Sequence, residues 1–138
     1  MSNLILWADD DPDDLLLSQE ILNSYIDNFT IREAHNGQEV LDYLQQCQHG
    51  RQPYPCLIVL DINMPLKDGK ETLAEIKNQE HLHTIPVILY STSKNPADQE
   101  YCQKFNVELL AKPNSYTEMR DIIAYILNNN IKPFTLGM

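Results

Sequence analysis

The fold of this chain is decided by two apolar runs that end in acids, LILWADDD at residues 4–11 and LIVLD at residues 57–61. Apolar runs of this length are typical of parallel strands that are covered on both faces. Since parallel strands end at the same edge of a sheet, the acids should lie together in the crevice at that edge. Clustered carboxylates repel one another, so we expect a divalent cation or protonation to hold them.

Strand and helix patterns alternate along the rest of the chain without a repeat or a linker. Strands are expected at residues 4–8, 30–34, 56–60, 86–90 and 108–111. Apolar residues at helical spacing predict helices in between, the first marked by Leu15, Leu22 and Ile26, and a weakly amphipathic fourth at about 95–105. The polar stretch 45–55 is expected to be a surface loop. Five βα units in this order predict an α/β fold with a doubly wound parallel sheet.

Length and composition exclude several classes of protein. The chain has 138 residues, 43% of them hydrophobic, which suits one domain. A formal net charge of -10 argues against nucleic acid or an anionic membrane as a direct partner. Three widely spaced cysteines, Cys47, Cys56 and Cys102, fit a reducing compartment better than a disulfide framework or a zinc site. Because we find neither a signal-peptide pattern nor a transmembrane stretch, we expect a cytoplasmic protein.

The acids at the strand ends are the candidate chemical groups. Asp61 could be an ordinary strand-end turn residue, but beside other acids it is a candidate nucleophile that accepts a phosphoryl group as an acyl phosphate. A magnesium site is predicted where Asp9 and Asp10 lie near Asp61, because Mg²⁺ takes a few carboxylates together with waters and phosphate oxygens. The backbone carbonyl of Asn63 would complete such a shell.

The acids that follow Asp10 have a structural explanation. Asp11 is expected to cap a helix that begins at Pro12, with Asp13 and Asp14 in its first turn. By this interpretation only Asp9 and Asp10 are left for chemistry. Trp7, inside the first strand, is expected in the core.

Two later apolar runs end in a hydroxyl and an amine. Ser91 follows VILY at residues 87–90, and Lys112 follows LLA at residues 109–111. A serine in this place often caps a helix or forms a turn, and solvated lysines are common. A lysine that faces three acids, however, suits the binding of a phosphoryl oxygen. Together with the acids, these residues predict a site for phosphoryl transfer.

In this combination the chain resembles the receiver domain of two-component response regulators. The residues that carry the resemblance occur in the family's order: Asp9-Asp10, Asp61, Met64-Pro65, Asp68-Gly69, Ser91 and Lys112-Pro113. The resemblance implies a receiver domain over residues 1–130, with a tail over 131–138 that is too short for an output domain. It also implies a flavodoxin-like sheet with the strand order 2-1-3-4-5. The loop around Gly50 is similar to that of single-domain receivers that partner phytochrome-type kinases.

The same resemblance implies roles and partners. Asp61 would be the phospho-acceptor, Asp10 a direct Mg²⁺ ligand and Asp9 a ligand through water, while Ser91 and Lys112 would contact the phosphoryl group. The donor would be a sensor histidine kinase or a phosphotransfer protein, and an unknown downstream protein would receive the signal by contact. The chain would not be an enzyme beyond its own phosphorylation and dephosphorylation.

Three alternatives and one departure from the family accompany this interpretation. An aspartyl phosphatase of the haloacid-dehalogenase type needs a second acid two residues after the nucleophile, where this chain has Asn63. A flavodoxin-like cofactor binder needs a phosphate loop after the first strand, where this chain has acids. A receiver-fold scaffold that is never phosphorylated would not need the complete site. The departure is Leu109, which stands where many receivers carry the aromatic residue that reports the switch.

Overall fold

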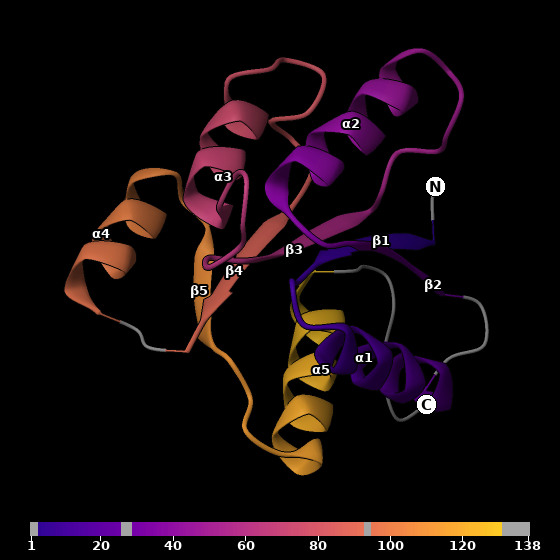
Figure 1. Ribbon diagram of the computed structural model, residues 1–138, viewed down its shortest axis with the longest axis vertical. Coiled ribbons are helices and arrows are strands. Elements are labelled where there is room, and N and C mark those ends of the chain that lie inside the picture. The colour runs from indigo at the N-terminus through magenta and orange to yellow at the C-terminus, as the bar shows by residue number, and fades with distance from the viewer. Residues whose placement is uncertain (1–2, 26–28, 93–94, 131–138) are drawn as a thin grey trace.

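In the computed structural model, which describes residues 3–25, 29–92 and 95–130, the chain forms a parallel sheet with helices on both faces (Figure 1). In chain order its elements are β1 (Leu4–Ala8), α1 (Pro12–Tyr25), β2 (Thr30–Ala34), α2 (Gly37–Gln48), β3 (Leu57–Asp61), α3 (Gly69–Lys77), β4 (Val87–Ser91), α4 (Pro96–Lys104), β5 (Glu108–Ala111) and α5 (Tyr116–Asn130). The strand order is β2-β1-β3-β4-β5, and all neighbouring pairs are parallel. The predicted doubly wound sheet of order 2-1-3-4-5 is therefore confirmed.

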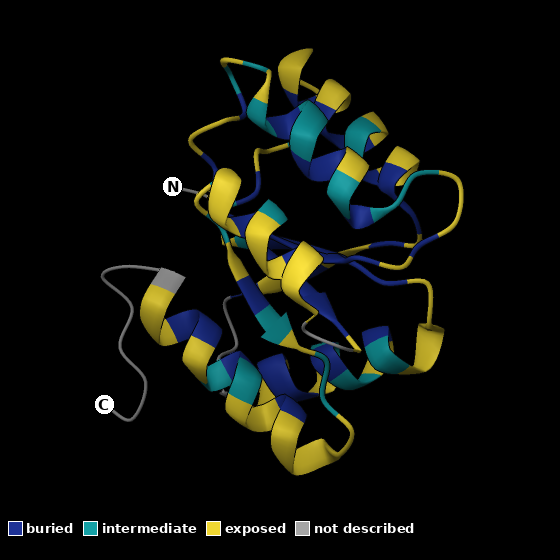
Figure 2. Ribbon diagram, turned by 90° about the vertical axis from the view of Figure 1, so that its left-hand side faces the viewer, coloured by how far each residue is buried: buried dark blue, intermediate teal, exposed yellow. Residues whose placement is uncertain are grey.

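Side chains that alternate along the strands fill a separate core on each face of the sheet. Figure 2 shows buried residues along the strands and exposed residues on the outer sides of the helices. The core beneath α2, α3 and α4 includes Leu6, Val40, Leu44, Leu73, Ile76 and Cys102. The core beneath α1 and α5 includes Ile5, Trp7, Leu22, Met119 and Ile123. Trp7 is buried, as expected. Covering both faces explains why the central strands read as continuous apolar runs.

Two central strands lie one residue later than predicted. β3 covers residues 57–61 instead of 56–60, and β4 covers 87–91 instead of 86–90. Pro86 has no N–H to donate to the ladder, although its carbonyl accepts a hydrogen bond of 2.9 Å from the Ile58 N–H. The shift makes Asp61 and Ser91 the last residues of their strands, so that neighbouring strands hold their backbones.

The segment before β3 also differs from the prediction. The prediction of a loop over residues 45–55 is wrong for the first four of them, because α2 continues to Gln48. Its glutamines are exposed, which is compatible with a helix that buries its other face. The Tyr43 hydroxyl and the Cys47 thiol donate to the Pro53 carbonyl over 2.8 and 3.2 Å, and so tie the following loop to the helix.

The helices begin at the caps that the sequence suggests. The Asp11 side chain accepts a 2.9 Å hydrogen bond from the Asp13 N–H, which confirms it as a cap before Pro12. α4 lies within the predicted range of 95–105 and is capped by Asn95. Two expectations, Ile26 in the first helix and the tail 131–138, concern residues outside the described ranges. Across the described residues, no helix has the length and apolar character that crossing a membrane requires.

Candidate functional site

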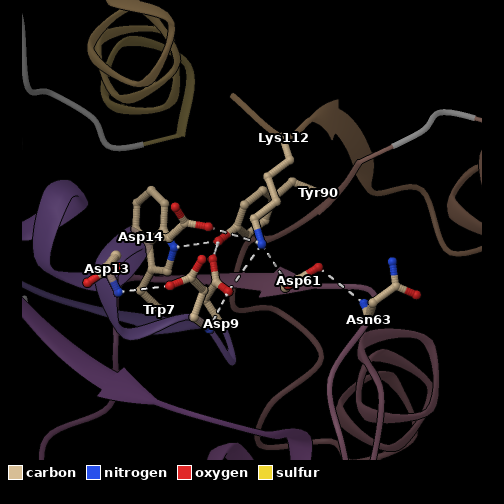
Figure 3. Close-up of polar contacts among 9 residues, drawn as sticks. Trp7, Asp9, Asp13, Asp14, Asp61, Asn63, Tyr90 and Lys112 are labelled. Carbon is tan, nitrogen blue, oxygen red and sulfur yellow. Dashed lines mark hydrogen bonds and ion pairs between the residues drawn. The ribbon is translucent and has the colours of Figure 1, made fainter. Parts of the chain in front are cut away.

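Acids from β1 and β3 meet at the carboxyl edge of the sheet (Figure 3). Asp9 directly follows β1, and Asp61 ends the adjacent β3. Asp9 and Asp61 are buried, with 0% and 2% exposure, whereas Asp10 is exposed. One carboxylate oxygen from each of the three acids lies within 4.8 Å of the other two. The structure thus brings together the carboxylates that the sequence predicted to meet.

The donor set of this cluster fits a divalent cation. Its ligand atoms are carboxylate oxygens, which hard divalent ions prefer, and the exposed Asp10 leaves a side open for water or substrate oxygens. The Asn63 N–H donates to Asp61 Oδ1 over 3.1 Å, so the chain turns back over the carboxylate directly after β3. The role of the Asn63 carbonyl as a further ligand stays a prediction.

Lys112 binds the acids together. Its Nζ lies 3.0 Å from Asp61 Oδ2 and 3.2 Å from Asp9 Oδ1. β4 separates β5 from β3, so the lysine side chain extends across the end of β4 to reach both acids. Its own N–H donates to the Ser91 carbonyl over 2.7 Å and prolongs the ladder between β4 and β5. The expectation that only a metal or protonation would hold the acids was incomplete, because an internal ammonium also does so.

Burial changes the protonation of this pair. It raises the pKa of Asp61 to about 6, and the hydrogen bond and charge of Lys112 offset only part of the rise. Burial acts to lower the pKa of Lys112, but its hydrogen bonds and attraction to Asp61 and Asp9 outweigh this and hold the pKa above its usual range. Lys112 is therefore a permanent cation near neutral pH, while the ionised Asp61 is incompletely stabilised.

Sequence reasoning missed Tyr90 as part of the site and placed Trp7 only in the core. Trp7 Nε1 donates to the Tyr90 hydroxyl over 3.1 Å, and that hydroxyl donates to Asp9 Oδ2. The two rings meet edge to face with centroids 6.1 Å apart, and Lys112 Nζ lies 5.4 Å from the centre of the Tyr90 ring. Burial, and then the charge of Asp9, raises the pKa of Tyr90 well above its ordinary value, so the phenol stays protonated.

These contacts fix the orientation of Asp9. Its Oδ2 accepts from Tyr90, and its Oδ1 accepts from the Asp11 N–H over 3.0 Å and from Lys112. Both aromatic residues lie within apolar runs, where burial alone explains them. The available signal was their position in the sequence, since Trp7 stands two residues before Asp9 and Tyr90 directly precedes Ser91.

Asp14 was also missed, because it was assigned only to the start of a helix. Its Oδ2 lies 3.2 Å from Lys112 Nζ, and its side chain is 30% exposed (Figure 3). The sequence interpretation left only Asp9 and Asp10 of this acidic run for chemistry, whereas Asp14 also reaches the site through its ion pair with Lys112. α1 begins so close to the end of β1 that its first turn presents Asp14 to the lysine.

Ser91 and Leu109 occupy the remaining positions that the sequence singled out. Ser91 ends β4 at the same edge as Asp61 and is buried. The action of its hydroxyl on a phosphoryl group stays a prediction. Leu109 is buried in the core beneath α2, α3 and α4, level with Leu89.

Comparison with known proteins agrees with this geometry. Residues 5–124 match the sequence profile of the response regulator receiver domain. The chain belongs to this family. Response regulator Rcp1 of Synechocystis is 38% identical to this receiver over 96 residues, which make up 69% of this chain and 65% of Rcp1. The alignment therefore spans less than two thirds of that relative's length.

Two solved structures resemble this receiver closely. The phosphorylated cyanobacterial phytochrome response regulator RcpA superposes with a TM-score of 0.87 at 31% identity, and all of both chains is covered. The Mn²⁺-bound form of response regulator Rcp1 has a TM-score of 0.84 at 31% identity, with 98% of this chain and 99% of that chain covered. The predicted receiver fold is confirmed.

Proposed function

We propose that this receiver accepts one phosphoryl group on Asp61 and passes the signal on by contact with another protein. The observation that carries the proposal is the buried Asp61 carboxylate, which ends β3 between a cluster of acids and the Lys112 ammonium. A nucleophile, an anion-binding amine and a cation site at one strand end are the parts that phosphoryl transfer to a carboxylate needs. The similarity to RcpA, a response regulator solved in phosphorylated form, supports it.

The reaction forms one bond and breaks one bond. An Asp61 carboxylate oxygen attacks phosphorus, and the donor's leaving atom departs with the electron pair of its bond to phosphorus. The phosphoryl group then carries negative charge on its remaining oxygens, which Lys112 and Ser91 bind through ammonium and hydroxyl hydrogens. Tyr90 keeps Asp9 oriented throughout, because its hydroxyl donates to Oδ2 while Lys112 donates to Oδ1.

We propose Mg²⁺ as the cation, held by Asp10, Asp61 and the Asn63 carbonyl, with Asp9 acting through water. Bound there, it would neutralise charge on the phosphoryl oxygens. The carboxylate donor set supports this assignment, and the Mn²⁺-bound form of Rcp1 is a precedent for a divalent ion in a similar protein.

The partners follow from the chemistry of the acceptor. We infer that this protein is cytoplasmic, that its donor is a phosphohistidine on a sensor histidine kinase or a phosphotransfer protein, and that an unknown downstream protein reads the result. The chain then catalyses only its own phosphorylation and dephosphorylation. The similarity to the phytochrome response regulator RcpA favours a phytochrome-type kinase as the first donor to try.

Incubation with Mg²⁺ and acetyl phosphate, followed by intact mass measurement, tests the proposal. We expect one added phosphoryl group, none in the Asp61→Asn variant and none when EDTA replaces Mg²⁺. Equal labelling of the variant would refute the assignment, and an unlabelled wild-type protein would favour the scaffold alternative. Steady release of phosphate from a phosphomonoester would instead favour the phosphatase alternative.

A further inference from the structure

We propose that Asp14 is a positioning residue that acts through Lys112: it weakens binding of the phosphoryl group at Asp61 and strengthens binding of the divalent cation. The inference rests on the proposed function, since it concerns the same site. It departs from the sequence-based interpretation, which gave Asp14 only a role at the start of α1.

The geometry shows that Asp14 competes for the lysine. Lys112 Nζ has three hydrogens, and three carboxylates surround it: Asp61 at 3.0 Å, Asp9 at 3.2 Å and Asp14 at 3.2 Å. Asp9 and Asp61 belong to the sheet edge, whereas Asp14 comes from α1 and is partly exposed. In the unmodified protein the ammonium therefore donates hydrogen bonds to Asp61 and Asp9 and forms an ion pair with Asp14, so three negative charges share it.

Phosphorylation changes the demand on this ammonium. The phosphoryl group brings negative charge to Asp61, and Lys112 must turn toward it. Asp14 opposes the change in two ways, because it retains part of the ammonium's attraction and because its charge repels the incoming anion. Removing the charge of Asp14 should therefore favour the phosphoryl-bearing state.

The effect on the cation has the opposite sign. Asp14 adds negative charge beside the acids, and it shares the Lys112 ammonium with Asp61 and Asp9, whose carboxylate oxygens a metal would use. Without that charge, Lys112 would stay on Asp61 and Asp9 and compete more strongly with the cation. A role confined to starting the helix would not shift the two affinities in opposite directions.

Calorimetric titration of the full chain with Mg²⁺, and then with beryllofluoride at saturating Mg²⁺, tests the proposal. For Asp14→Asn we expect Mg²⁺ affinity to fall, and beryllofluoride affinity to rise, each by about fivefold, as suits a partly exposed charge. Asp14→Glu keeps the charge and should stay close to wild type. Asp13→Asn is the matched control, because this exposed acid lies in the same turn of α1 and has the same charge.

Each outcome decides the question. The role of Asp14 would be overturned if the Mg²⁺ and beryllofluoride affinities of Asp14→Asn stayed unchanged or shifted in the same direction. It would also be overturned if they matched the affinities of Asp13→Asn. If the wild-type protein bound no beryllofluoride and took no label, the proposed function would fail. The Mg²⁺ titration would then still test Asp14, since a loss of affinity confined to Asp14→Asn supports its action on the cation site. Thermal unfolding of each variant verifies that it is folded.

Discussion

Replacing Asp61 by asparagine should make the metal-free protein more stable at neutral pH, although it removes the proposed phospho-acceptor. The ionised carboxylate is buried, and its pKa is raised from 3.8 to about 6. This change corresponds to a cost of about 3 kcal/mol for keeping Asp61 ionised in the folded state. Since structural relaxation and entering water reduce such costs, we expect a gain of about 1–3 kcal/mol.

The sign of the effect depends on pH. A carboxyl group whose folded pKa lies above its unfolded value binds more protons in the folded state between those two values. The contribution of Asp61 should therefore lower the stability of the wild-type protein as the pH rises from about 4 to about 6. Above that range this contribution should stay level. Asparagine does not titrate, so the advantage of the variant should be full above about pH 7 and vanish toward about pH 3.5.

Urea unfolding followed by circular dichroism, in EDTA at several pH values, measures this difference. Asp13→Asn serves as the control for a lost exposed charge. Adding Mg²⁺ should stabilise the wild-type protein more than Asp61→Asn, because ligand binding to the folded state adds to its stability. An Asp61→Asn protein that is less stable than wild type in EDTA at neutral pH would refute the reasoning. Such a result would mean that the contact with Lys112 outweighs the burial of the charge.

Three further outcomes test other parts of the site. Asp10→Ala should abolish binding of Mg²⁺ in calorimetry while metal-free thermal stability stays level or rises, because one of the clustered negative charges is gone; a large loss of stability would make Asp10 structural. Tyr90→Phe should cost about 1–3 kcal/mol in urea unfolding, because it leaves Trp7 Nε1 and a buried carboxylate oxygen without the hydroxyl; Tyr125→Phe, at an exposed hydroxyl, should cost much less. Beryllofluoride should alter amide hydrogen exchange in α4 and β5, to a modest extent because Leu109 is not aromatic; changes confined to residues 45–55 would exclude this route.

The sequence by itself determined the order of the elements and the edge at which the chemistry lies. Short apolar runs that lie between segments with helical periodicity identify strands that are buried on both faces. Parallel strands of one sheet have their carboxyl ends at the same edge. Asp9, Asp10 and Asp61 could therefore be placed in one cluster without coordinates. The strand ends were displaced by one residue, because the apolar pattern does not show which backbone groups the ladder will pair.

Only the tertiary structure decided which side chains touch within that edge. The reach of Lys112 across β4 depends on strand spacing and side-chain direction, which a single strand's pattern does not contain. Asp14 meets the lysine because of where α1 starts above the sheet, and Tyr90 meets Asp9 because of the register between strands. The order of the strands along the chain, and their ends to within one residue, follow from local sequence. Contacts across elements follow instead from how those elements pack, and packing is a property of the whole chain.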